Sequence, residues 1–253
     1  MTRNSWIIFI AIAVILFGGL IYLSSRNAID VSKINEQTVQ GATEASGNIA
    51  DHTTGTKDNK VILVEYGDYQ CPGCGSAFAP LKAVTEKYEG QLTFVFRNFP
   101  LTSIHPNARA AAAAAETAGL MGKYWEMHDL LYSNQTSWQS ISADKRTDQF
   151  ADYAAQAGLN RDTFLKNLTE KSKQINQKIS FDQALGKKLG VSGTPAIYLN
   201  GEKVEQYVKD GKIVTSNTDG AGPIWANANA LDELLVRPAL EKAGYKDLPS
   251  TKE

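Results

Sequence analysis

The chain has few of the residues that build a metal site or a set of structural disulfides. Its 253 residues include two cysteines, Cys71 and Cys74, and three histidines in scattered contexts, His52, His105 and His128. A structural zinc ion normally takes four cysteine or histidine ligands, so we expect no metal and no other cofactor. Half of a zinc site and a single structural disulfide stay open as alternative uses of the cysteines.

An excess of charge of either sign is also missing. The sequence carries 26 Lys and Arg against 27 Asp and Glu, a formal net charge of -1. A nucleic-acid-binding domain normally shows a clear excess of basic residues, so no nucleic-acid partner is expected. The sequence contains no internal repeat and no glycine-rich phosphate-binding motif. With 43% hydrophobic residues, it is long enough for one large or two small globular units.

Both cysteines lie in one stretch, Tyr-Gly-Asp-Tyr-Gln-Cys-Pro-Gly-Cys-Gly-Ser, at residues 66–76. The apolar, β-branched run at 61–66 predicts a buried strand. Pro72 suits the first position of a following helix, which places Cys71 at the N-cap. Free backbone N–H groups there stabilise a thiolate, and the pKa of such a thiol falls from about 8.5 to roughly 3.5–7.5. Cys74, one turn later and more sheltered, is expected to be the resolving thiol of a redox-active pair.

A second motif lies far downstream, at residues 190–201. It reads as a Gly-Ser turn, a Thr-Pro step, an apolar strand and an Asn-Gly hairpin turn. With this motif the chain resembles the DsbA-like thiol:disulfide oxidoreductases, which have the thioredoxin fold. The resemblance implies that Pro195 is the cis-proline beside the dithiol, that Thr194 precedes it, and that this loop binds an extended substrate peptide. It also implies that Glu65 is a buried acid that relays protons to Cys74.

The same residues allow other interpretations. Only about 5–6% of X-Pro bonds in folded proteins are cis, so Pro195 taken alone is an ordinary trans turn residue. Glu65 taken alone is a strand-end carboxylate that faces solvent. His105 and His128 are interpreted as helix-start and packing residues rather than catalysts. The Pro-Gly dipeptide between the cysteines departs from the family, where an aromatic residue or histidine often precedes the second cysteine, and this leaves the redox potential open.

Further matches to the DsbA-like group occur at 97–101, 105–108 and 122–131, and the resemblance covers roughly residues 57–244. We therefore expect an α/β thioredoxin fold with an inserted helical subdomain. The expected divisions are a membrane anchor at 1–23, a flexible polar tether at 24–58, the DsbA-like domain at 59–245 with its insertion at about 103–189, and a C-terminal tail at 246–253.

Hydrophobic periodicity and turn signals predict the individual elements. They are strands at 61–66 and 91–99 with a helix at 72–88 between them, helices at 107–119, 124–132, 144–157 and 161–189, a strand at 196–199 with an antiparallel partner from Glu202, and a last helix at 226–243. A strand-helix-strand unit implies that the first two strands are parallel. Residues 206–223 are polar and rich in glycine; the sequence predicts only a short strand at 212–215 there, and no function.

Residues 6–23 form an unbroken run of apolar residues and glycine. As a helix this run would span about 27 Å, close to the hydrocarbon thickness of a bilayer. No Ala-x-Ala-like cleavage site follows it, so we expect an uncleaved signal anchor rather than a removed signal peptide. A disulfide donor belongs outside the cytoplasm, which would place the catalytic domain on the extracytoplasmic side of the cell membrane.

The resemblance implies an enzyme that introduces disulfide bonds into folding secreted or membrane proteins by exchange through Cys71 and Cys74. The implied partners are cysteine-containing proteins and a membrane oxidase of the DsbB or VKOR type that recharges the dithiol. Two alternatives stay open: a disulfide isomerase or reductase with the same dithiol, and a non-catalytic peptide-binding module with a structural disulfide.

Overall fold

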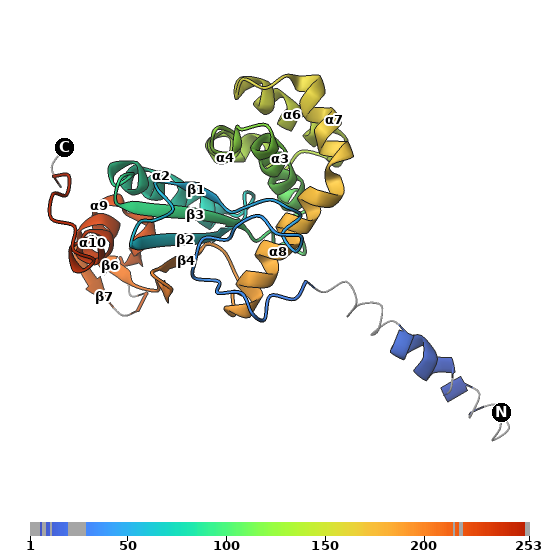
Figure 1. Ribbon diagram of the computed structural model, residues 1–253, viewed down its shortest axis with the longest axis horizontal. Helices are drawn as coiled ribbons and strands as arrows, with labels where there is room; N and C mark the ends of the chain where they lie inside the picture. The colour runs from blue at the N-terminus through green and yellow to red at the C-terminus, as the bar shows by residue number, and fades with distance from the viewer. Residues whose placement is uncertain are drawn as a thin grey trace.

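The computed structural model describes residues 6, 9–10, 12–19, 29–214, 216–217 and 220–250 (Figure 1). The predicted membrane anchor at 6–23 falls in part on residues outside this set. Within the set, no helix has both the length and the apolar composition that crossing a membrane requires.

A five-stranded sheet forms the centre of the domain, in the order β1-β3-β2-β4-β5. Its middle strands are β2 (Val61–Gly67) and β3 (Leu92–Asn98), which are parallel as predicted. β4 (Ala196–Leu199) runs antiparallel to β2, and the short strands β1 (His52–Thr54) and β5 (Glu202–Lys203) form the two edges. Nearly every residue of β2 and β3 is buried, as expected of apolar strands that are covered on both faces.

Helices cover both faces of this sheet (Figure 1). On one face, α2 (Pro72–Lys87) and the C-terminal helices share a core with Leu63 and Phe94. On the other face, α8 (Ser172–Lys188) shares a core with Tyr66. Side chains alternate between the two faces along a strand, so Glu65 of β2 lies on the face that α2 covers.

Helices occupy the region predicted as the inserted subdomain. They are α3 (Ala108–Leu120), α4 (Tyr124–Ser133), α5 (Gln135–Trp138), α6 (Ala143–Gln156), α7 (Arg161–Glu170) and α8. Most alanines of α3 are buried, and their small side chains let α4 and α8 pack close to this helix. The helix expected at 161–189 is interrupted at Lys171, which ends α7 and precedes α8.

The flexible tether expected at 24–58 is wrong for residues 29–58, which pack against the domain; residues 24–28 lie outside the described set. Val31 and Ile49 are buried, and β1 adds an edge to the sheet. The carboxylate of Asp51 lies 2.7 Å from the Arg97 guanidinium and 2.9 Å from the Lys178 ammonium, and none of these three side chains is exposed. The domain boundary predicted at residue 59 is therefore too late. Buried ion pairs hold this segment against the domain, so its polar composition does not indicate a flexible tether.

The C-terminal part holds a second, three-stranded sheet and a broken helix. The sheet has the order β7-β6-β8 and is built from β6 (Tyr207–Lys209), β7 (Lys212–Val214) and β8 (Gly222–Pro223). The helical stretch comprises a 3-10 turn at Ile224–Ala226, α9 (Ala228–Leu231), a π-helical turn at Asp232–Val236 and α10 (Arg237–Lys242). The wide π turn lies just before Pro238, which has no N–H to donate to the preceding turn.

Candidate active site

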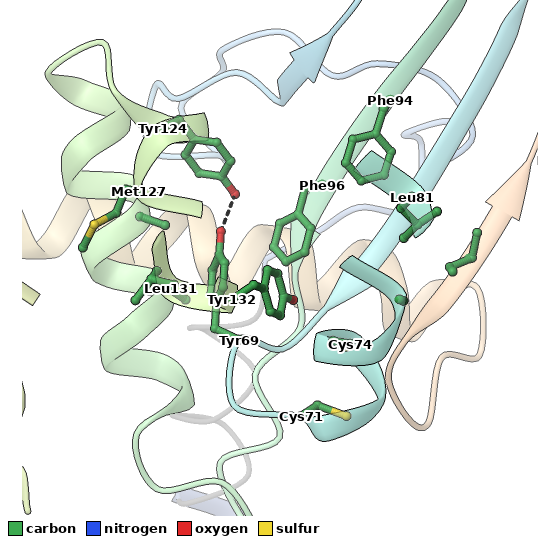
Figure 2. Packing of buried hydrophobic residues seen from close by; sticks show 14 of the residues in the cluster. Tyr69, Cys71, Cys74, Leu81, Phe94, Phe96, Tyr124, Met127, Leu131 and Tyr132 are labelled. Carbon is green, nitrogen blue, oxygen red and sulfur yellow. Dashed lines mark hydrogen bonds between the residues drawn. The ribbon is translucent and has the colours of Figure 1, made fainter. Parts of the chain in front are cut away.

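Cys71 and Cys74 stand at the start of α2 (Figure 2). Cys71 is the N-cap residue, with an extended backbone, and Pro72 is the first helical residue, both as predicted. Both cysteines are free thiols. Cys71 keeps 8% of its surface exposed whereas Cys74 is fully buried. A substrate sulfur can therefore reach Cys71 from solvent, and Cys74 only through Cys71.

The pKa of the Cys71 thiol is lowered from 9.0 to about 5. The largest cause is a hydrogen bond with the Cys74 side chain, and hydrogen bonds with Thr194 and with the backbone N–H groups of Cys74 and Gly73 act in the same direction, while burial opposes them. When protonated, the Cys71 thiol can donate to the carbonyl oxygen of Thr194, which lies 3.3 Å from the sulfur; this contact favours the thiol and does not outweigh the others. At neutral pH Cys71 is therefore a thiolate, the form that acts as nucleophile or leaving group in disulfide exchange.

Cys74 has the opposite protonation state. Burial, its hydrogen bond to Cys71 and the nearby Glu65 carboxyl raise the pKa of the Cys74 thiol well above 9.0. The backbone N–H of Asp68 donates to the Cys74 sulfur at 3.4 Å. Cys74 is therefore a protonated thiol, and it must lose a proton before it can attack and gain one after it leaves.

Glu65 lies next to this pair, with only 2% of its surface exposed. Burial first, and then the charge of Cys71, raise the pKa of the Glu65 carboxyl from 4.5 to about 8, while a hydrogen bond with the Cys74 side chain lowers it. The acid is thus buried beside Cys74, as the resemblance implied, and does not face solvent. Its elevated pKa suits a group that exchanges a proton with a neighbour near neutral pH.

The peptide bond between Thr194 and Pro195 is cis, as the resemblance implied. This loop leads into β4, where Ala196 pairs with Tyr66 of β2, so the sheet positions the loop beside the dithiol. A Cβ atom at Gly73 would lie 3.1 Å from Pro195 Cδ and 3.6 Å from the Cys71 sulfur. The glycine between the cysteines thus allows the cis-proline loop to approach them closely.

Three further residues hold the cysteine loop. Asp68 lies within the cysteine motif and His105 within the match at 105–108, whereas Gln135 has no local signal in the sequence. The Gln135 side chain, on α5, donates hydrogen bonds to the carbonyl oxygens of Tyr69 at 2.8 Å and Cys71 at 2.9 Å. The carboxylate of Asp68 lies 2.7 Å from His105 Nδ1 and accepts from the backbone N–H of Leu101 at 2.9 Å. His105, expected only at a helix start, is thus part of the support of the active site.

A family profile described as Thioredoxin matches residues 47–214, more than half of the chain. Its first residues, 47–58, lie in the segment expected to be a tether.

Curated relatives and solved structures extend this likeness. The Na(+)/H(+) antiporter NhaA 1 of Salinispora arenicola is 35% identical over 153 residues, which is 60% of this chain and 22% of the relative; the chain thus spans less than a quarter of that relative's length. BdbD from Bacillus subtilis superposes with a TM-score of 0.57 at 20% identity, over 82% of this chain and 100% of that structure. MdbA of Corynebacterium diphtheriae, a thiol-disulfide oxidoreductase, superposes with a TM-score of 0.53 at 23% identity, over 66% of this chain and 88% of that structure. At these identities the structural likeness is one of fold.

Proposed function

We propose that this chain, which belongs to the thioredoxin family, is a thiol:disulfide oxidoreductase that passes a Cys71–Cys74 disulfide to cysteines of folding proteins. The observation that carries the proposal is the difference in exposure and in pKa between the two thiols. Cys71 is accessible and its thiol pKa is about 5, whereas Cys74 is buried and its thiol pKa is raised. A structural disulfide needs neither property.

The exchange proceeds in two steps. A substrate thiolate attacks the Cys71 sulfur of the disulfide, and the Cys71–Cys74 bond breaks while a mixed disulfide forms. Cys74 leaves as a thiolate and takes the proton of the Glu65 carboxyl. A second substrate thiolate then attacks the substrate sulfur of the mixed disulfide, which forms the substrate disulfide and releases Cys71 as a stable thiolate. Two electrons pass from the substrate dithiol to the enzyme.

Substrate is held, in this proposal, at the cis-proline loop. Thr194 and Pro195 lie beside Cys71, so an extended peptide that pairs with this loop would bring its cysteine to the exposed sulfur. The reduced enzyme then needs an oxidant to begin another cycle. A membrane oxidase of the DsbB or VKOR type is the partner we propose for this step.

We place the domain on the extracytoplasmic side of a membrane, tethered by residues 6–23. The support is the length and apolar character of that run in the sequence and the need of a disulfide donor for an oxidising compartment. Washing membranes with carbonate tests the anchor, because an anchored protein stays with the membrane. Recovery of a soluble form that starts near residue 25 would show that the segment is a removed signal.

Trapping of mixed disulfides tests the exchange itself. With Cys74→Ala first charged at Cys71 as a mixed disulfide with glutathione, we expect thiolates of reduced, unfolded protein substrates to displace glutathione and to accumulate as mixed disulfides through Cys71, because the internal thiol that resolves them is gone. With Cys71→Ala, none should form, since Cys74 is buried. Non-reducing electrophoresis and mass spectrometry identify the linked cysteine. Capture through Cys74 would reverse the roles, and capture by neither variant would favour the non-catalytic peptide-binding alternative.

A further inference from the structure

A cavity of about 290 Å³ lies on the α2 face of the sheet, with Glu65 in its lining. The apolar walls are Phe78 and Leu81 of α2, Phe94 of β3 and Trp125 of α4. Figure 2 shows Leu81 on α2 and Phe94 on the neighbouring strand. Cys74 lies on the same helix as the first two. The cavity thus starts at the acid beside the resolving thiol and extends away from the exposed sulfur of Cys71.

The lining holds polar atoms that lack a hydrogen bond. Glu65 Oε1, His128 Nε2 and Thr54 Oγ1 are buried and have no hydrogen-bond partner among the residues that the structure describes, and all three residues line this cavity. A buried polar group without a partner costs about 1–3 kcal/mol. Three such groups around one space indicate that it is built for a polar content such as water, which needs 2–4 polar partners.

His128 is oriented to accept a proton inside the cavity. Its Nδ1 lies 3.1 Å from Asp129 Oδ1, and Asp129 is in turn ion-paired with Lys82. When Nδ1 carries the hydrogen that bonds to this carboxylate, Nε2 presents a lone pair. Burial is the largest cause of a lowered pKa of His128. The lowered pKa keeps the ring neutral and able to take up a proton.

The far end of the cavity opens to solvent. The side chains of Lys82 and Asp129 are 41% and 32% exposed, and that of Glu86 is 66% exposed, whereas His128 is 4% exposed. His128 therefore lies between the buried acid and a charged, hydrated rim. Titratable groups from four parts of the chain face Glu65 and His128. They are Tyr69 and Cys71 just before α2, Cys74, Lys82 and Glu86 on α2 with Glu89 just after it, Tyr124, Asp129 and Tyr132 on α4, and His52 on β1.

We propose that this cavity is the path by which Glu65 exchanges its proton with solvent, and that His128 is the residue that takes up and returns that proton. The inference rests on the proposed function. When Cys74 attacks a mixed disulfide, its thiol proton passes to the Glu65 carboxylate, which must first have lost its own. That proton moves from Glu65 to His128 Nε2, directly or through water, and leaves at the rim; in the opposite direction it returns the same way. No electrons move in this transfer.

The reaction of the reduced protein with glutathione disulfide separates this transfer from the rest of the chemistry. In the first step the Cys71 thiolate attacks glutathione disulfide, and one glutathione thiolate leaves. In the second step Cys74 loses its proton to Glu65 and attacks the Cys71 sulfur, which releases the second glutathione thiolate. Only the second step needs Glu65 to be deprotonated. Acid quenching followed by mass spectrometry gives the rate of each step.

Two substitutions of His128 provide the test. His128→Phe keeps an aromatic ring among Tyr69, Phe78 and Tyr132, which surround the native ring, and His128→Ala leaves room for a small molecule. We expect both to slow the second step by about tenfold or more, since a positioned proton-transfer group contributes roughly 10²–10⁴-fold, with the first step unchanged. Added imidazole should restore the second step in His128→Ala but not in His128→Phe, where the ring fills the site.

Each outcome decides one claim. A wild-type protein that forms no mixed disulfide at Cys71 would overturn the proposed function. A wild-type protein that reacts, with a His128→Phe variant whose second step matches it between about pH 5 and 9, would overturn only the proton path. Equal acceleration of both variants by imidazole would also overturn it, because it would show catalysis from bulk solvent. If His128→Ala unfolds, as its melting curve would show, the His128→Phe rates still decide the question.

Discussion

At the scale of single residues, the dithiol is asymmetric because each thiol changes the other. Cys74 stabilises the Cys71 thiolate through its side chain, which is the largest cause of the lowered Cys71 pKa. The same contact, with burial, keeps the proton on Cys74. The helix N-terminus contributes through the backbone N–H groups of Gly73 and Cys74, but less. The sequence predicted a low pKa from the helix position alone; the partner thiol is the greater influence.

Removing the partner thiol should therefore raise the pKa of Cys71. With Cys74→Ala, we expect the midpoint of thiolate formation to move from about 5 toward the ordinary value of 9.0, without reaching it because the backbone N–H groups and Thr194 stay. The pH dependence of iodoacetamide alkylation measures this midpoint. Ser76→Ala, which removes a hydroxyl bonded to Pro72 O on the same helix, is the control and should not shift it. A midpoint still near 5 in Cys74→Ala would assign the effect to the helix terminus.

The burial of Glu65 also makes a prediction for stability. Its pKa rises from 4.5 in the unfolded chain to about 8 in the folded one, so between these values the folded protein holds a proton that the unfolded chain has released. Stability must then fall as the pH rises through this window, by up to about 1.4 kcal/mol per pH unit. Glu65→Gln removes that fall.

Urea unfolding of reduced wild-type protein and of Glu65→Gln, at several pH values, provides the measurement. The variant should gain stability relative to wild type as the pH increases from about 5 to 8. Cys71 titrates in both proteins, so the difference reports Glu65 together with its interaction with the Cys71 charge. A constant difference across this range would mean that the carboxyl is not held protonated by the fold.

At the scale of elements, apolar periodicity separates what the sequence could predict from what it could not. β2, β3, β4 and α2 are apolar runs or carry an apolar face, and the structure has them close to the predicted bounds. Residues 29–58 have no such pattern, because polar contacts with distant residues hold them. Arg97, for example, donates to Asp51 and also to the carbonyl oxygen of Thr38 at 2.7 Å. Partners of this kind lie far away in the sequence and leave no local period.

The buried ion pairs of Asp51 should make this segment essential for stability. Asp51→Asn leaves the guanidinium of Arg97 buried without its carboxylate partner, and leaves the ammonium of Lys178 with Asp182 as its remaining carboxylate. Breaking a buried pair on one side costs about 3–5 kcal/mol, and we expect that loss in the free energy of unfolding at neutral pH. The exposed pair of Arg161 with Asp148 supplies the control: Asp148→Asn should cost at most about 1 kcal/mol. Equal losses of unfolding free energy in the two variants would show that residues 29–58 do not contribute to the stability of the domain through Asp51.

At the scale of the whole molecule, the site is assembled from parts that the chain brings together over long distances. The two cysteines, Glu65 and Pro195 belong to motifs with a recognisable spacing, and they could be predicted. The amide of Gln135 and the imidazole of His128 come from the helical insertion and are ordinary residues in their own stretches. His128 falls in the stretch at 122–131 that matches the DsbA-like group. Only the packing of α4 and α5 against the start of α2 gives the two side chains their role, so no local pattern could reveal that role.

The redox state should therefore change the stability of the entire domain, in a direction that depends on pH. The thiolate of Cys71 is present in the folded reduced protein above a pKa of about 5, and in the unfolded chain only above 9.0. Its contribution is thus complete above 9.0 and is lost as the pH falls through the folded value. The oxidised protein lacks it. Closing the short Cys71–Cys74 loop stabilises the oxidised form by about 2 kcal/mol in the chain-entropy description.

These two effects predict a crossing. Near pH 5 the stabilisation by the disulfide is the larger effect, and the oxidised form should melt at the higher temperature. Each further pH unit adds up to about 1.4 kcal/mol to the free energy of unfolding of the reduced form, and solvent screening at Cys71 reduces this amount. From about neutral pH upward the reduced form should therefore be the more stable. Glu65 opposes this gain, because the Cys71 charge raises its pKa, and Glu65→Gln should therefore steepen the dependence. Melting both redox forms of wild type and variant across this range tests the crossing. The same free energy difference makes the disulfide a donor in equilibrium with glutathione, so an oxidised form that stays clearly more stable at every pH would point to a reductase or a structural disulfide instead.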